Sequence, residues 1–518
     1  MRGRNGRRHR STRGAQSRSF RGGTGGKPAC DASASAGAQG VPEKGGLSLR
    51  VVYLDIDSLR PDHLGCYGYR RPTTPHIDRL AEQGVRFTRC YTSDSPCMPS
   101  RAALFSACFG IRNGIVTHGP RAQLLQAPGP SLPLLLRNAG LRTCTVSSFG
   151  RHPSPWFLVG WDEVADPTGW GFQGVPAWAS AERAIAWLRR HATEDFFLHV
   201  HMWDPHGWRN APDGCLQAVT ADPGAVPPQW PTAEQVSAHQ GMSAWHSARS
   251  AGMTDRAAVE RMYDGYDAQV RYADHHVGLI LKCLHDLGIL DDTLVILSAD
   301  HGQEFGEHGV YFEHWSVYEG TSRVPLIIRY PRAIAQGETD GGLAYQLDVT
   351  ATVAEAFGLA IPAAWDSRSL WPRLHAPAAA DGGRPYLVCG HGLYTAQRAV
   401  VQGRWKLIRT LNPGHWELPP VQLFDLTVDP WEQHDLGGER ADVVQALSGL
   451  LNDWEYTHPS PGGVDPMRVN ATLGPQGIMG PAARRMREAT DGPSRTPRLA
   501  TEERKPEVDF SAAAGWWA

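Results

Sequence analysis

Three short polar groups, far apart along the chain, combine residue types that could hold a metal ion beside a nucleophile. Asp57 and the pair Asp300-His301 each end an apolar run, and Cys97 stands between them in the sequence. Carboxylates with one imidazole form a suitable site for a hard divalent cation. An Asp at a strand end is as often a turn residue or a helix cap, so each group alone is weak evidence. The combination predicts a metal site of Asp57, Asp300 and His301, with Cys97 beside the ion.

Arg101 stands four residues after Cys97 in the pentad Cys97-Met98-Pro99-Ser100-Arg101. Side chains four residues apart in a helix lie on the same face. A guanidinium there could orient the nucleophile or neutralise a developing anion. The alternative is a surface arginine on a helix, and within this pentad we favour the catalytic role.

The surrounding elements predict how these distant residues meet. Residues 49–57 form a β-rich run that ends in acidic residues, as a buried parallel strand does when it delivers ligands at its C-terminal end. Strands and helices then alternate, which predicts an α/β fold: a large, mostly parallel sheet flanked by helices. The carboxyl ends of such strands converge on one crevice. The expected strands are 143–146, 196–201, 294–298 and 324–328, and the expected helices are 75–84, 131–138, 181–191 and 254–287.

The character of the sequence changes after Pro362, and a small C-terminal α+β subdomain is predicted there. Residues 399–408 are typical of a hairpin with Gln402-Gly403 at its turn, 423–426 of a strand and 441–454 of a helix. Beyond that helix the chain is rich in Pro, Gly, Arg and Ala without apolar periodicity, so we expect no order. The predicted domains are a basic N-terminal tail (1–46), a catalytic domain (47–362), the subdomain (363–459) and a low-complexity tail (460–518).

Composition and charge are those of a globular enzyme. The hydrophobic fraction is 41%, the charged fraction 20% and the net charge −2, which gives no global field for nucleic acid or membrane. The nine cysteines contain no CxxC pair, which indicates reduced, mostly buried thiols. Residues 1–27 lack the apolar region of a secretory signal, and no stretch has the length of a membrane span. We expect a cytoplasmic protein, the alternative being an export signal hidden by a mis-annotated N-terminus.

Five motifs in order resemble the sulfatase branch of the alkaline phosphatase superfamily, from about Val51 to Trp454. The resemblance includes the arylsulfatases and the phosphonate monoester hydrolases. The motifs are Asp57 to Gly68, Cys97 to Leu104, Ser298 to Gly302, Tyr318 to Ile328, and Leu423 to Leu426 with Asp429-Pro430.

This resemblance implies an alkaline phosphatase-like fold and a sulfuric ester hydrolase. It also implies that a formylglycine-generating enzyme oxidises Cys97 to formylglycine during maturation. The hydrated aldehyde then attacks sulfur, and its second hydroxyl releases the sulfate. The resemblance implies one divalent cation, calcium, magnesium or manganese, held at Asp57, Asp300, His301 and residue 97.

The same resemblance gives candidates around the substrate. His206, after the strand that ends near His201, has the place of a general acid, because imidazole titrates near neutrality. His118 has the place of a polar active-site residue, although a loop histidine is commonly only solvated.

Several positions depart from the sulfatase pattern. Ser58 follows Asp57 where many sulfatases have a second Asp, and Asp55 is an uncertain replacement. Arg151 and His152 stand in place of a Gly-Lys-Trp-His segment and are candidates for its cationic contacts with the substrate. His314 stands in place of a substrate-binding lysine, where a protonated imidazole could bind an anion. These departures leave open whether the substrate is a small-molecule or carbohydrate sulfate ester, or a phosphonate monoester or phosphodiester. A non-catalytic binding protein on the same fold ranks last, because neither the cysteine nor the metal residues are lost.

Overall fold

The computed structural model describes residues 49–119, 125–151, 154–167, 175–222, 228–240, 251–377, 382–414, 416–475 and 505–513. Contacts divide the chain into two units, Met1–Gly46 and Leu47–Ala518, and every described residue belongs to the second.

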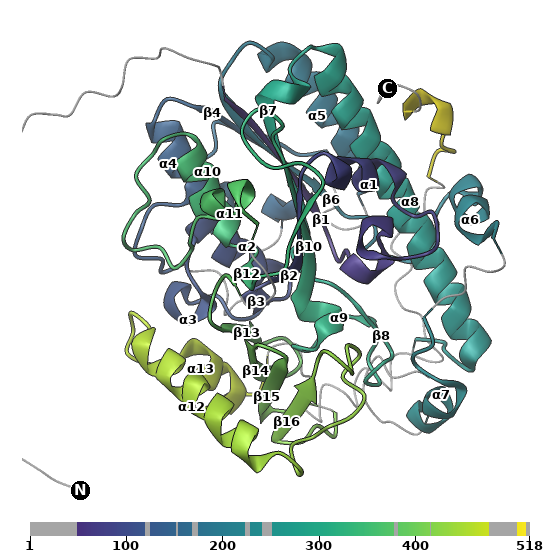
Figure 1. The fold of residues 1–518 in the computed structure, drawn as a ribbon, viewed down its shortest axis with the longest axis vertical. Helices are drawn as coiled ribbons and strands as arrows, with labels where there is room; N and C mark the ends of the chain where they lie inside the picture. Colours follow the sequence, from purple (N-terminus) through teal and green to yellow (C-terminus); the bar gives the residue numbers. More distant parts are fainter. Residues whose placement is uncertain are drawn as a thin grey trace, which may run out of the picture. The chain divides into compact units, whose positions relative to one another are not determined.

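A central sheet dominates the described part of the chain. Its strands are β1 (Arg50–Ile56), β2 (Val85–Tyr91), β4 (Arg142–Val146), β5 (Glu163–Ala165), β6 (Phe196–Met202), β7 (Thr293–Ser298), β10 (Arg323–Arg329), β11 (Glu338–Asp340) and β12 (Ala344–Tyr345). Their order is β11-β2-β10-β7-β1-β6-β4-β5, and β12 pairs with β2 (Figure 1). Every residue of β1 is buried, as expected for a strand at the centre of a covered sheet.

The predicted parallel sheet is confirmed, with one exception. β1 is parallel to both β6 and β7, and β4 is parallel to β6. β10 runs antiparallel to its neighbours β7 and β2. The connection from β7 to β10 contains only the short hairpin β8 (Glu304–Phe305) and β9 (Tyr311–Glu313) and the one-turn helix α9 (Glu319–Ser322). A parallel return is usually made through a crossover helix, and this connection contains no more than one turn of helix, which suits an antiparallel return.

Helices cover both faces of this sheet (Figure 1). On one side lie α1 (Pro75–Glu82), α5 (Ala177–His191) and α8 (Arg256–Asp286), with α6 (Asp213–Thr220) packed against α8. On the other lie α2 (Cys97–Ser106), α4 (Leu132–Asn138), α10 (Asp348–Ala356) and α11 (Trp371–His375). The short helices α3 (Gly110–Asn113) and α7 (Ala233–His239) complete this part. None of the helices within the described ranges is both long enough and apolar enough to span a membrane.

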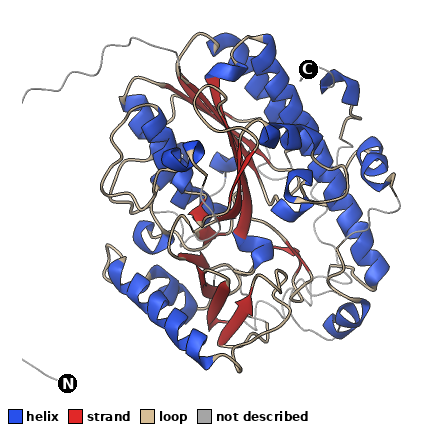
Figure 2. Cartoon of the chain, viewed as in Figure 1, coloured by secondary structure: helices blue, strands red, loops and turns tan. Residues whose placement is uncertain are grey.

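A second, smaller sheet carries the C-terminal subdomain (Figure 2). Its order is β16-β15-β14-β13-β3, from β3 (Asp94–Ser95), β13 (Leu387–His391), β14 (Ala396–Gln402), β15 (Trp405–Asn412) and β16 (Val421–Asp425). The predicted hairpin is β14–β15, and the pairing of Gln402 with Trp405 moves the turn one residue later, to Gly403-Arg404. Gly403 has a φ of 55°, which glycine adopts without strain. Helix α12 (Ala441–Thr457) contacts β14 and β15.

Some residues of the segment 460–518, for which we expected no order, are structured. Helix α13 (Pro466–Thr472) packs against β14, β15 and α3. Asp465 caps it by accepting the backbone N–H of Met467 at 2.9 Å, and Pro466 supplies the first helical residue. Met467 and Asn470 are the buried positions. A helix with so few apolar residues leaves little periodic signal in the sequence.

A buried lysine joins the second sheet to the connection between β7 and β10. Lys406 of β15 is fully buried, and its Nζ lies 2.9 Å from Glu319 of α9 and 3.0 Å from Glu432. Burial opposes the charge of this amine, but the two carboxylates raise the pKa of Lys406 above its ordinary value. The contact holds the start of β10 against the subdomain through paired charges.

Replacing this amine should destabilise the protein. Lys406→Met leaves two carboxylates buried without their cation, so the free energy of unfolding in urea should fall by about 3–5 kcal/mol. Lys282→Met is the matched control, because Lys282 pairs with Asp286 on an exposed helix face and should change stability by less than about 0.5 kcal/mol. Equal losses in the two variants would contradict the role of Lys406.

Candidate functional site

Cys97 lies buried at the start of α2, directly after the short strand β3. Its side chain is 2% exposed, and its Sγ lies 3.1 Å from Nε2 of His301. Burial, and then the charges of Asp57 and Asp300, raise the pKa of the Cys97 thiol well above its ordinary value. Because the thiolate is the nucleophilic form, the unmodified thiol is poorly suited to attack here in the absence of a cation.

The predicted metal residues converge at the carboxyl ends of β1 and β7. Asp57 directly follows β1, and Asp300 and His301 follow β7, its parallel neighbour. One ligand atom from each of Asp57, Cys97, Asp300 and His301 lies within 4.8 Å of the others, and all four residues are buried. Two carboxylates, an imidazole and a sulfur at this spacing fit a divalent cation. The residues predicted from the sequence therefore lie together in the structure, although 243 positions separate 57 from 300.

Arg101 lies on the same face of α2 as Cys97, one turn later, and is fully buried among three carboxylates. Its Nε donates to Asp55 at 3.0 Å, its Nη1 to Asp300 at 2.6 Å and its Nη2 to Asp57 at 3.2 Å. The ring of Phe149 lies 4.7 Å from the guanidinium carbon and covers it. Arg101 is thus part of the charge balance of the metal residues, a role that the sequence reading did not foresee.

Ser58, which replaces the second Asp of many sulfatases, supports the neighbouring carboxylates. Its hydroxyl donates to Asp57 at 3.0 Å, and its backbone N–H donates to Asp300 at 3.2 Å. The φ of Ser58 is 59°, a left-handed conformation that is uncommon outside glycine. This backbone turn directs the N–H of Ser58 toward Asp300.

Asp55, an uncertain replacement ligand by sequence, belongs to a different environment. Its Oδ2 accepts from Arg101 and, at 3.2 Å, from Nε2 of His199. Burial opposes its charge, but Arg101 and His199 lower the pKa of Asp55 to about 2. Asp55 is absent from the clusters of potential ligands found among the described residues.

Two histidines, one in β6 and one in the segment after it, lie near Asp57. His201, inside β6, places Nε2 3.2 Å from Oδ2 of Asp57, and its Nδ1 lies 2.9 Å from Oγ of Ser147. His206 places Nε2 3.9 Å from Oδ1 of Asp57, and its side chain is 30% exposed. His206 therefore lies near the potential metal ligands with access to solvent, while burial lowers its pKa below the ordinary value.

His314, which stands where the sulfatase pattern has a lysine, is buried. It is 5% exposed, its ring stacks 4.2 Å from that of His301, and its Nδ1 lies 3.2 Å from Oε1 of Gln303. Burial, followed by the charges of His301 and His206, holds the pKa of His314 well below its ordinary value. The expected anion binding by a protonated His314 is therefore unfavourable at neutral pH. As a neutral imidazole, His314 lies with Cys97 and His301 in a second set of potential ligands.

Of the remaining candidates from the sequence, one side chain is described in the structure and two are not. His118 accepts the backbone N–H of Met98 at its Nε2, 3.1 Å away, and so borders the start of α2. His152 and the side chain of Arg151 lie outside the described residues. His199 was missed altogether. Its only sequence signal was a histidine two positions before His201 on the same strand face.

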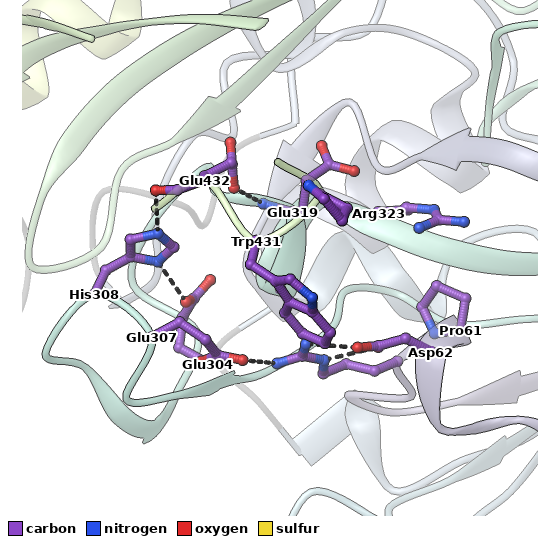
Figure 3. Close-up of a pocket in the computed structure, with 12 residues that line it drawn as sticks. Pro61, Asp62, Glu304, Glu307, His308, Glu319, Arg323, Trp431 and Glu432 are labelled. Carbon is purple, nitrogen blue, oxygen red and sulfur yellow. Dashed lines mark hydrogen bonds and ion pairs between the residues drawn. The ribbon is translucent and has the colours of Figure 1, made fainter. Parts of the chain in front are cut away.

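A separate cavity of about 100 Å³ lies beside Arg60 and contains none of these residues. Figure 3 shows Trp431 and Glu432 facing Asp62 and Glu307 across it. The charges here are paired: Arg60 lies 2.8 Å from Asp62 and 2.6 Å from Glu307. We read the cavity as part of the charged contact between the subdomain and the β7–β10 connection, and not as the chemical centre.

Comparisons with known proteins give the family and the fold. A relative named N-acetylglucosamine-6-O-sulfatase, from Bacteroides thetaiotaomicron, is 24% identical over 486 residues, covering 78% of this chain and 85% of the relative. A solved structure in complex with its substrate D-glucosamine-2-N,6-O-disulfate shares 22% identity, with a TM-score of 0.66, and covers 81% of this chain and 99% of that one. The phosphonate monoester hydrolase of Agrobacterium radiobacter has a TM-score of 0.63 at 20% identity, with 79% and 96% covered. These two structures share the fold.

The family models identify the chain itself. The model named Sulfatase matches residues 50–359, and the model named N-sulphoglucosamine sulphohydrolase, C-terminal, matches residues 306–455. Because the first of these covers more than half of the sequence, the chain belongs to the sulfatase family of sulfuric ester hydrolases.

Proposed function

We propose that this protein hydrolyses a sulfate ester, carried by a carbohydrate or another small molecule, with a formylglycine nucleophile made from Cys97. The observation that carries the proposal is the position of Cys97, 3.1 Å from His301, at a buried set of potential metal ligands and one helical turn before Arg101. A hydrated aldehyde at this position offers two hydroxyls, one to attack sulfur and one to release the product.

Asp57, Asp300 and His301 would hold one divalent cation, with residue 97 completing the site. When bound, the ion would favour ionisation of the attacking hydroxyl and stabilise negative charge on the ester oxygens. The excess charge supports this assignment, because Asp55, Asp57 and Asp300 pair with the one guanidinium of Arg101 among the residues that the structure describes. Their arrangement leaves negative charge for a cation to neutralise.

Three further residues would position the metal ligands, donate a proton and contact the substrate. Arg101 holds Asp57 and Asp300 in place from the same helix that carries residue 97. His206, whose ring has solvent access, is placed to give a proton to the leaving alcohol oxygen. His118 borders the start of α2 and would contact the substrate on that side.

A phosphonate monoester or phosphodiester hydrolase is the second candidate. The observation that favours it is the metal residue set, in which Ser58 supports Asp57 where many sulfatases have a second Asp. The same nucleophile, metal residues and His206 would serve that reaction.

Conversion of Cys97 is the first test. After expression with a formylglycine-generating enzyme, mass spectrometry of the peptide over Cys97 should show the aldehyde in place of the thiol. Cys97→Ala should abolish turnover of an aryl sulfate, while Cys215→Ala, which removes a buried thiol from α6, should leave it near wild type. Wild-type turnover by Cys97→Ala, or an unconverted thiol in active enzyme, would refute the nucleophile.

Metal binding is the second test. Asp300→Asn should weaken binding of calcium, magnesium or manganese by at least about 10-fold in titration calorimetry, because one charged ligand is lost. The control is Asp274→Asn. Burial raises the pKa of Asp274 to about 7, and its carboxylate accepts the backbone N–H of Ile77 away from the site. Equal affinities for wild type and Asp300→Asn would remove Asp300 from the metal site.

Substrate choice is the third test. An aryl sulfate should react with a higher kcat/KM than an aryl phosphonate monoester or a phosphate diester carrying the same leaving group. The use of one leaving group separates preference at sulfur or phosphorus from reactivity of the alcohol. A phosphonate monoester turned over faster than the sulfate would favour the second candidate.

A further inference from the structure

Asp55 is a buried carboxylate that the proposed reaction does not use. It lies on β1 two residues before Asp57, on the same strand face, and is fully buried. Its Oδ2 receives two donors, Nε of Arg101 at 3.0 Å and Nε2 of His199 at 3.2 Å. An ionised group is costly to bury, so its presence so close to the metal residues calls for a role.

His199 is fixed on every side and has no access to substrate. It lies inside β6 and is fully buried. Its Nε2 donates to Asp55, and its Nδ1 lies 2.8 Å from Oγ1 of Thr145 on β4. The rings of Phe105 and Trp161 lie 5.1 and 6.0 Å from its own ring. The imidazole can therefore present only one orientation to Asp55.

The same arrangement repeats two residues further along the three strands. There, Ser147, directly after β4, contacts His201 of β6, whose Nε2 contacts Asp57 after β1. Each of the two carboxylates is thus held by an imidazole from β6, and each imidazole is held in turn by a hydroxyl at the carboxyl end of β4. The two hydroxyl–imidazole–carboxylate arrangements differ in the role of the carboxylate. Asp57 belongs to the set of potential metal ligands, and Asp55 does not.

Asp55 instead occupies the one nitrogen of Arg101 that the metal residues leave open. The guanidinium is planar, so the directions of the N–H groups on its three nitrogens are fixed relative to one another. With Nε held by Asp55, Nη1 points at Asp300 and Nη2 at Asp57. Without that hold, the long side chain of Arg101 could rotate and release one of these carboxylates.

We propose that Asp55 and His199 form a positioning pair that sets the orientation of Arg101, and through it the spacing of Asp57 and Asp300. This inference rests on the proposed function for its effect on turnover. The orientation of Arg101 is a property of the folded chain and can be measured without turnover.

The first experiment follows the Nε–H of Arg101 by nitrogen-15 NMR, in wild type, Asp55→Asn, His199→Gln and His199→Leu. A held Nε–H exchanges slowly with water, and Asp55→Asn should speed its exchange at least about 10-fold. His199→Gln, whose amide can reach Asp55 from the position of Nε2, should keep the slow exchange, and His199→Leu should lose it. Melting temperatures confirm that each variant folds, and the two His199 variants keep the test open if Asp55→Asn does not fold.

The second experiment is a double-mutant cycle in the formylglycine-containing enzyme with an aryl sulfate. Asp55→Asn should lower kcat by about 100-fold, the effect of a small misplacement of a catalytic group, with KM within about 3-fold of wild type. In the Arg101→Lys background, which has no Nε to hold, the same change should cost less than about 3-fold.

Two results would overturn the inference. One is a kcat loss from Asp55→Asn that is unchanged in the Arg101→Lys background. The other is a loss of metal affinity in Asp55→Asn as large as that in Asp57→Asn, which would make Asp55 a ligand. Slow Nε–H exchange controlled by Asp55 and His199 in an enzyme that does not hydrolyse sulfates would instead refute the proposed function and leave the positioning pair intact.

Discussion

The site depends on one buried guanidinium shared by three buried carboxylates. An ion taken out of water is tolerated only when its partners and hydrogen bonds replace the lost hydration. Arg101 meets this condition with one carboxylate for each of its three nitrogens. Because these carboxylates come from β1 and the ends of β1 and β7, and the arginine from α2, their contacts fix how the helix docks against the two strands. The same docking places residue 97 beside the potential metal ligands, so the proposed nucleophile would owe its position to the ion pairs of Arg101.

The charge balance also assigns the metal ion a part in substrate binding. Without it, the three carboxylates outnumber the guanidinium of Arg101, the one that pairs with them in the described part of the chain, and burial lowers the pKa of both His201 and His314. Such a centre repels an anionic ester, since like charges interact strongly where water is excluded. A divalent cation would neutralise the excess negative charge and allow the centre to bind an anion. We therefore expect the ion to govern substrate affinity as well as the rate of the chemical step.

The sequence was sufficient to predict which residues meet at the carboxyl ends of β1 and β7. It was not sufficient to predict the contacts that hold these residues in place. Asp57, Asp300 and His301 end apolar runs, and strand order in α/β sheets brings such ends together. Cys97 and Arg101 share a helix face because their spacing is one turn. The partner of Asp55, by contrast, depends on the register of β1, β6 and β4, which no local pattern contains. The direction of β10 and the buried contact of Lys406 depend likewise on how distant segments pack, and the neutral state of His314 depends on its burial.

A neutral His314 would limit the negative charge that the site can stabilise on a substrate. A lysine at this position would add a fixed positive charge to the site, whereas a buried imidazole with a lowered pKa adds none. A centre with fewer cations stabilises a singly charged group better than it stabilises a doubly charged one. Sulfate esters, phosphonate monoesters and phosphodiesters each carry one negative charge near neutral pH, while phosphate monoesters approach two. We therefore expect slower turnover of phosphate monoesters than of the other three classes, with the choice among those three made by the pocket that receives the alcohol.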